Sequence, residues 1–124
     1  MMNPYEKYKQ QSVMTMTQGE MVVRLYEEII NQLSRAVNCI REKDIEGTNA
    51  SLQKCQRIIN YLKSTLNFKY EVSSNLSSLY DFFNEQIIKS NLKKDTQPIE
   101  EILPLVSELK DTFAQGERLS RMQQ

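Results

Sequence analysis

The chain has 124 residues, of which 40% are apolar and 26% charged, an ordinary balance for a single globular domain. Sixteen basic residues offset sixteen acidic ones, so the protein lacks the net positive charge that attracts nucleic acid or an anionic membrane. It contains no histidine, which removes the commonest general base and metal ligand and excludes the Glu-x-x-His di-iron sites of many helical bundles.

Residues 1–16 are expected to form a mobile leader before the first helix. The start is polar and contains Pro4, so it does not have the apolar core of a signal peptide. No apolar run approaches the roughly 18 residues of a membrane span, and the two cysteines form no CxxC motif. A cytosolic protein without membrane insertion is therefore expected, in which Cys39 and Cys55 act as small buried apolar residues.

The first helix is predicted over residues 17–43. The run Thr17-Gln18-Gly19-Glu20 is a capping box, in which the Thr17 hydroxyl accepts from a free backbone N–H and Glu20 reaches back to the cap. The apolar residues that follow are spaced three and four apart, which places them on one broad helix face. They are Val22, Leu25, Tyr26, Ile29, Leu33, Ala36, Val37 and Ile40.

The second helix is predicted over residues 44–66, with Asp44 as its N-cap. Its apolar residues repeat in alternating steps of three and four, a heptad pattern typical of helices that pack in bundles. A short turn is expected over residues 67–71. The heptad residues are Leu52, Cys55, Ile59, Leu62 and Leu66.

The third helix is predicted over residues 72–93 and contains more apolar surface than one core stripe requires. Phe82, Ile88 and Leu92 lie outside its main stripe, and Ile58 and Tyr61 add to the excess on the second helix. The excess indicates either a wide core or a groove that receives an amphipathic partner helix, and the residues alone leave both interpretations open. The main stripe consists of Val72, Leu76, Leu79, Tyr80, Phe83 and Ile87.

The fourth helix is predicted over residues 96–117. Pro104 is expected to kink this helix without breaking it, because the apolar spacing continues in register on both sides. Gly116 is expected to loosen the end, and residues 117–124 to fray. The apolar seam consists of Ile99, Ile102, Val106, Leu109 and Phe113.

Short connections between long helices make helices that follow each other in the chain antiparallel. The sequence therefore predicts an all-α protein with one domain over residues 1–124, an antiparallel up-down four-helix bundle with a mobile N-terminal leader segment. It contains no nucleophile paired with a base, no glycine-rich phosphate loop and no metal-ligand cluster. No enzymatic activity and no cofactor are expected.

Two further features have more than one interpretation. Asparagines recur on the predicted helices, among them Asn49, Asn60 and Asn91, either as neutral surface or as groups that bind the backbone of an extended ligand. The leader tyrosines Tyr5 and Tyr8 either cap the end of the core or form a movable lid over a groove.

Four segments carry motifs in a characteristic order: NPYEKYKQQSV, MTMTQGEMVVRLY, NLSSLYDFFNEQIIKSNLKKD and PIEEI. From about residue 3 to residue 115 they resemble the flagellin-specific export chaperone family FliS. Each motif is weak alone, but the ordered set is specific. The chain departs from the family in having Phe113 where a tryptophan is common, Lys69-Tyr70-Glu71 instead of a glycine pair, and an unusual Pro104. The matching positions are Tyr8, Ser12, Val13, Thr15, Thr17, Glu20, Leu25, Tyr26, Asn75, Leu76, Leu79, Tyr80, Asp81, Asn91 and Asp95.

The resemblance implies a cytosolic export chaperone that binds the disordered C-terminal segment of flagellin, prevents premature polymerisation and delivers flagellin to the flagellar type III export apparatus. A flagellar export-gate component and an anti-sigma factor are candidates for further partners, and a monomer or weak dimer is expected. The alternative is a structural or regulatory bundle that self-associates through exposed apolar surface. The leader and lid candidates are Tyr5, Tyr8 and Val13. The candidates for the flagellin-binding groove are Tyr26, Ile58, Tyr61, Leu76, Leu79, Tyr80, Phe83, Ile87 and Asn91.

Overall fold

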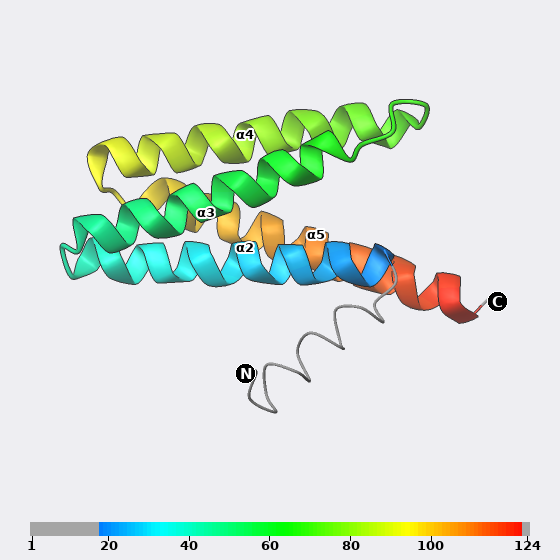
Figure 1. Ribbon diagram of the computed structural model, residues 1–124, viewed down its shortest axis with the longest axis horizontal. Helices are drawn as coiled ribbons and strands as arrows, with labels where there is room; N and C mark the ends of the chain where they lie inside the picture. The colour runs from blue at the N-terminus through cyan, green and yellow to red at the C-terminus, as the bar shows by residue number, and fades with distance from the viewer. Residues whose placement is uncertain (1–17, 123–124) are drawn as a thin grey trace, which may run out of the picture.

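The computed structural model describes residues 18–122. It contains four helices, α2 (Gln18–Arg41), α3 (Ile45–Ser64), α4 (Glu71–Lys93) and α5 (Gln97–Met122). Each helix runs back along the previous one, and α5 returns to pack against α2, which closes the bundle (Figure 1). The predicted all-α four-helix bundle is confirmed. The leader expected over residues 1–16 and the cap Thr17 lie outside the described residues, and so do the lid candidates Tyr5, Tyr8 and Val13.

The helix ends differ from the predicted ones by a few residues. Asp44 caps α3 as its Oδ1 accepts from the Gly47 N–H at 2.9 Å. The last helix passes through Pro104 without interruption and extends to Met122, five residues beyond the predicted end at residue 117. A Cβ at Gly116 would meet nothing within 4 Å, so no packing constraint favours a turn there. The helical cost of one glycine, about 1 kcal/mol, is too small to end a long helix.

The core is formed by apolar side chains from all four helices. Tyr26 lies at its centre, with its ring centroid 5.4 Å from that of Phe113. None of the helices within residues 18–122 is long and apolar enough to cross a membrane. The buried apolar residues are Tyr26, Ile29, Leu33, Ala36, Val37, Cys39, Leu52, Cys55, Ile59, Leu62, Tyr80, Phe83, Ile87, Ile99, Ile102 and Val106.

Candidate binding surface

The residues predicted to line a groove differ in their exposure. Tyr61 is 53% exposed and lies on the surface. Four others are half-buried, namely Ile58, Leu76, Leu79 and Asn91. The remaining four lie in the core, because each is on the side of its helix that faces the other three helices; they are Tyr26, Tyr80, Phe83 and Ile87.

Tyr26 and Tyr80 form a buried polar contact inside this core. Their hydroxyls share a hydrogen bond that links α2 to α4. Burial raises the pKa of Tyr26 well above its ordinary value, and the hydrogen bond with Tyr80 raises it further. Burial also raises the pKa of Tyr80, although the hydrogen bond with Tyr26 acts in the opposite direction. Both side chains are therefore neutral near pH 7, and their role here is to join two helices.

The two cysteines are free and buried. The Cys55 thiol donates to the Ile29 carbonyl, with 3.7 Å between sulfur and oxygen. Burial, and secondarily the charge of Glu28, raise the pKa of the Cys55 thiol to about 12. A thiol with so little thiolate is a poor nucleophile and metal ligand, so Cys55 acts as a core residue. Among residues 18–122 no group of three or more Cys, Asp or Glu side chains could hold a metal ion.

An open apolar groove lies where the N-terminal turns of α4 approach the C-terminal half of α5. It has a volume of about 460 Å³. Val72, at the start of α4, is 57% exposed on its wall. A Cβ added to Gly19 would come within 1.8 Å of a Glu117 carboxylate oxygen, the far end of a flexible side chain that extends from α5 over this glycine. The lining residues are Gly19, Val72, Leu76, Leu109, Thr112, Phe113, Gly116 and Glu117. We call this surface the α4–α5 groove.

A second apolar pocket lies on the other side of the first turn of α2, against the end of α3. Its volume is about 310 Å³. Phe68 and Tyr70, in the connection between α3 and α4, are 63% and 65% exposed at the same end of the bundle (Figure 1). The lining residues are Gln18, Met21, Val22, Leu25, Tyr61, Leu62 and Thr65. We call this surface the α2–α3 pocket.

Sequence reasoning missed the α5 wall of the α4–α5 groove. Leu109 and Phe113 continue the apolar seam, so their spacing predicts core positions, whereas both are half-buried. The available signal was the composition beside them. Gly19 and Gly116 are small residues on two predicted helices, and small residues mark places where backbones approach closely or a groove floor is open.

The outer junction of α3 and α4 is polar. The Asn84 amide donates from Nδ2 to Asn60 Oδ1 at 3.0 Å, and Lys63 Nζ lies 2.5 Å from Asp81 Oδ1 one turn further along. Asn84 Oδ1 is buried and accepts no hydrogen bond from the described residues. A shallow pocket of about 260 Å³ follows near the end of α4, lined by Gln56, Ile87, Ile88, Asn91, Leu92 and Lys94.

Comparisons with known protein sequences identify one family. The family model described as Flagellar protein FliS matches residues 1–119. The flagellar secretion chaperone FliS of Bacillus subtilis (strain 168) is 34% identical over 114 residues, which cover 92% of this chain and 86% of that protein. The FliS of Escherichia coli (strain K12) is 28% identical over 108 residues, with coverages of 85% and 79%.

A solved structure supports the same architecture. The crystal structure of a flagellar chaperone from bacteria matches with a TM-score of 0.77, covering 92% of this chain and 94% of that one. The sequence identity is 22%, so this match concerns the fold alone.

Proposed function

The chain belongs to the FliS family of flagellar secretion chaperones, which is not a family of enzymes, and from that premise we propose that it binds the disordered C-terminal segment of flagellin. Binding prevents premature polymerisation in the cytosol and delivers the subunit to the flagellar type III export apparatus. The observation that supports this client is the pair of apolar surfaces, the α4–α5 groove and the α2–α3 pocket, on either side of the first turn of α2.

An amphipathic segment without fixed structure is the kind of ligand that such surfaces fit. Its apolar residues can enter two separate depressions, while its backbone orders only on contact. The ordering entropy lowers the affinity for a given buried area, which makes the complex releasable at the export apparatus. Neither surface is enclosed, so a long segment can lie across both of them.

The contact residues of this proposal come from the exposed and half-buried groups. Val72 and Leu76 form one wall of the α4–α5 groove, Phe113 lies across from them, and Tyr61 borders the α2–α3 pocket. The other half-buried candidates, Ile58, Leu79 and Asn91, extend this surface along α3 and α4. Tyr26, Tyr80, Phe83 and Ile87 lie in the core and line neither surface, so they are proposed to support the client site only through the packing of the helices.

The leader is proposed as a competitor of the client. The chain enters α2 at Gln18, which lines the α2–α3 pocket, and the next residue lines the α4–α5 groove. At about 3.3 Å per extended residue, a few residues before Gln18 suffice to reach either surface. Tyr5, Tyr8 and Val13 are the side chains proposed to occupy them. Deletion of residues 1–16 is expected to tighten client binding, and an unchanged affinity would contradict a lid.

The test of the client is a calorimetric titration of the full chain with the flagellin C-terminal peptide of the same organism. We expect one-to-one binding, a negative heat-capacity change and a gain in helical circular dichroism, because apolar surface is buried as the peptide folds. Absence of heat with an intact bundle would contradict the proposal. In that case, concentration-dependent sedimentation would favour the alternative of a self-associating bundle. An export-gate component and an anti-sigma factor would then be the next partners to test.

A surface variant then locates the contact. Val72→Asp is suitable because Val72 is exposed and an acid in the first turn of α4 is favoured by the helix dipole. It is expected to weaken client binding at least about fivefold, the usual effect of losing an interface anchor. Leu105→Gln, at a 38% exposed site on α5 that lines neither surface, is the matched control. Equal affinities of both variants would place the client elsewhere.

A further inference from the structure

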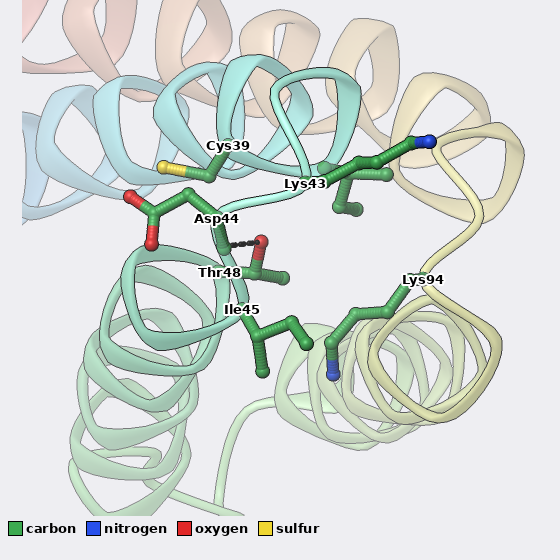
Figure 2. A pocket seen from close by; sticks show the side chains of 7 residues that line it. Cys39, Lys43, Asp44, Ile45, Thr48 and Lys94 are labelled. Atoms are coloured by element: carbon green, nitrogen blue, oxygen red, sulfur yellow. Dashed lines mark hydrogen bonds between the residues drawn. The ribbon is translucent and has the colours of Figure 1, made fainter.

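The opposite end of the bundle contains a pocket that the client proposal does not use. It lies where the α2–α3 connection meets the end of α4, far from the first turn of α2 (Figure 1), and its volume is about 380 Å³. Figure 2 shows that its side chains come from the end of α2, the start of α3 and the end of α4. They are Cys39, Ile40, Lys43, Asp44, Ile45, Thr48 and Lys94. We call it the turn pocket.

The interior of the turn pocket is apolar. Cys39 and Ile40 contribute the α2 side, and Ile45 stands at the start of α3 with 61% of its surface exposed. The Thr48 hydroxyl turns away to donate to the Asp44 carbonyl at 2.8 Å, which leaves the threonine methyl group toward its surroundings. An exposed isoleucine at a helix start adds nothing to the bundle core, but it extends the apolar lining of this pocket.

Both cationic residues of the turn pocket have an unusual backbone. Lys43 has φ 61° and Lys94 has φ 51°, and within residues 18–122 they are the non-glycine residues with positive φ. This left-handed conformation costs an L-residue free energy, whereas glycine adopts it freely and is the usual residue after a helix. The helix dipole favours a lysine in the last turn, yet it does not require one at the left-handed position itself. Both lysines end a helix in this conformation, as Asp44 N donates to the Cys39 carbonyl at 2.8 Å and Asp95 N to the Ser90 carbonyl at 3.1 Å, and both border the same pocket.

The positive charges are not neutralised by carboxylates of the described residues. Lys94 Nζ is held by neutral oxygens, at 2.7 and 2.6 Å from the carbonyl and Oδ1 of Asn91 and 3.2 Å from Asn49 Oδ1. Lys43 takes part in none of the ion pairs found between residues 18 and 122. The Asp44 carboxylate, which also borders the pocket, is engaged by the Gly47 N–H as the α3 cap.

We propose that the turn pocket docks a short acidic segment of a partner protein. One aliphatic side chain of that segment fills the space beside Cys39 and Ile45, and carboxylates on either side of it approach Lys43 and Lys94. Charge complementarity selects this occupant over a basic or purely apolar segment. The proposal does not depend on flagellin binding, because its test uses a peptide that is not flagellin, although Asn91, a proposed client contact, holds Lys94 Nζ beside the turn pocket.

The test is a titration of the isotope-labelled full chain with the acetylated, amidated hexapeptide Glu-Asp-Leu-Leu-Asp-Glu, followed by amide chemical shifts. We expect saturable shifts at residues 39–48 and at residue 94, with small changes at the α4–α5 groove. The charge-reversed peptide Lys-Arg-Leu-Leu-Arg-Lys is the control and should not shift these amides. Shifts of equal size with both peptides, shifts elsewhere, or none at all would overturn the proposal.

Two variants separate charge from packing. Lys43→Gly removes the amine, and glycine suits the left-handed backbone, so the fold is retained. This variant should lower the affinity for the acidic peptide about two- to fivefold. Ile45→Ala should lower the affinity for the acidic peptide roughly tenfold, because apolar contact is lost. Lys69→Ala, which removes an exposed lysine in the α3–α4 connection, should change nothing. An affinity unaffected by Lys43→Gly, or a loss as large with Lys69→Ala, would contradict the assigned site.

Discussion

Helices α2 and α4 are similar in length but differ in what they bury. The buried side chains of α2 are Tyr26, Ile29, Leu33, Ala36, Val37 and Cys39, all apolar apart from one hydroxyl. Half of the buried side chains of α4 are polar, namely Ser73, Gln86 and Ser90. The α2 helix also packs more extensively against its two neighbours than α4 does against its own.

Apart from the buried Tyr26–Tyr80 hydrogen bond, several polar contacts of α4 lie at its two ends. Ser73 Oγ donates to the Asn67 carbonyl at 2.6 Å near the start, and Ser90 Oγ donates to the Asp95 carbonyl near the end. Such bonds contribute less net free energy than apolar burial, because the same groups are well solvated when they separate. The α2 helix is therefore expected to contribute more to the free energy of unfolding than α4, which packs less extensively and buries more polar groups.

A pair of equivalent cavities, one on each helix, should have the largest effect and tests the difference between α2 and α4 directly. Leu33→Ala on α2 and Ile87→Ala on α4 each remove a buried aliphatic group that is at most 1% exposed. Leu33→Ala is expected to lower the free energy of unfolding by about 2–5 kcal/mol. Ile87→Ala should cost less, because a loosely packed α4 can shift to fill the space. Urea unfolding of both variants measures this, and an equal or larger loss for Ile87→Ala would refute the comparison.

The tyrosine pair tests the polar link between the same two helices. Tyr80→Phe leaves the Tyr26 hydroxyl buried without its partner, which should lower the free energy of unfolding by about 1–3 kcal/mol. The double variant Tyr26→Phe, Tyr80→Phe removes both hydroxyls and should recover part of that loss. Denaturant unfolding of the natural chain, Tyr80→Phe, Tyr26→Phe and the double variant gives the coupling free energy between the two hydroxyls. Additive losses would show that the hydrogen bond does not hold α4 to α2.

The same pair predicts a pH dependence. Both pKa values are raised in the folded state. The contribution of the protonated tyrosine pair to the free energy of unfolding is therefore complete below pH 10, the ordinary tyrosine value, and falls as the pH rises above it. The unfolded chain then releases protons that the folded state retains. The double phenylalanine variant should lose less stability than the natural chain between pH 9 and pH 11. Parallel curves for the two proteins would contradict this origin.

The smallest expected effect concerns the outer junction of α3 and α4. Asn60→Leu together with Asn84→Leu replaces an amide pair, one member of which has a buried unsatisfied oxygen, with an apolar pair. The free energy of unfolding should stay constant or rise by up to about 1 kcal/mol. Thermal unfolding measures it, with Asn60→Leu alone as the control that should destabilise. A large loss in the double variant would mean that the amides, and not apolar contact, hold α4 in place.

Much of the fold could be predicted from the residues because helix periodicity is a local property. The spacing of Leu33 and its neighbours on α2 is enough to identify a buried face, and Asp44 marks the start of α3 where the structure has its cap. The end of α5 was harder, since nothing local distinguishes a helix that stops at Gly116 from one that continues to Met122. Helix ends depend on small differences in free energy, which flanking residues determine only weakly.

Local periodicity and capping residues were enough to predict four helices in antiparallel order, and the ordered motifs were enough to predict the family. The division of the apolar residues into core and surface came from the way the four helices pack against each other. Val72 and Tyr80 belong to the same predicted stripe of one helix, yet Val72 is exposed and Tyr80 is buried. The same holds for Lys43 and Lys94, which are far apart in the chain and share one pocket. A periodic stripe specifies the side of one helix that is apolar, whereas exposure depends on where the other three helices lie.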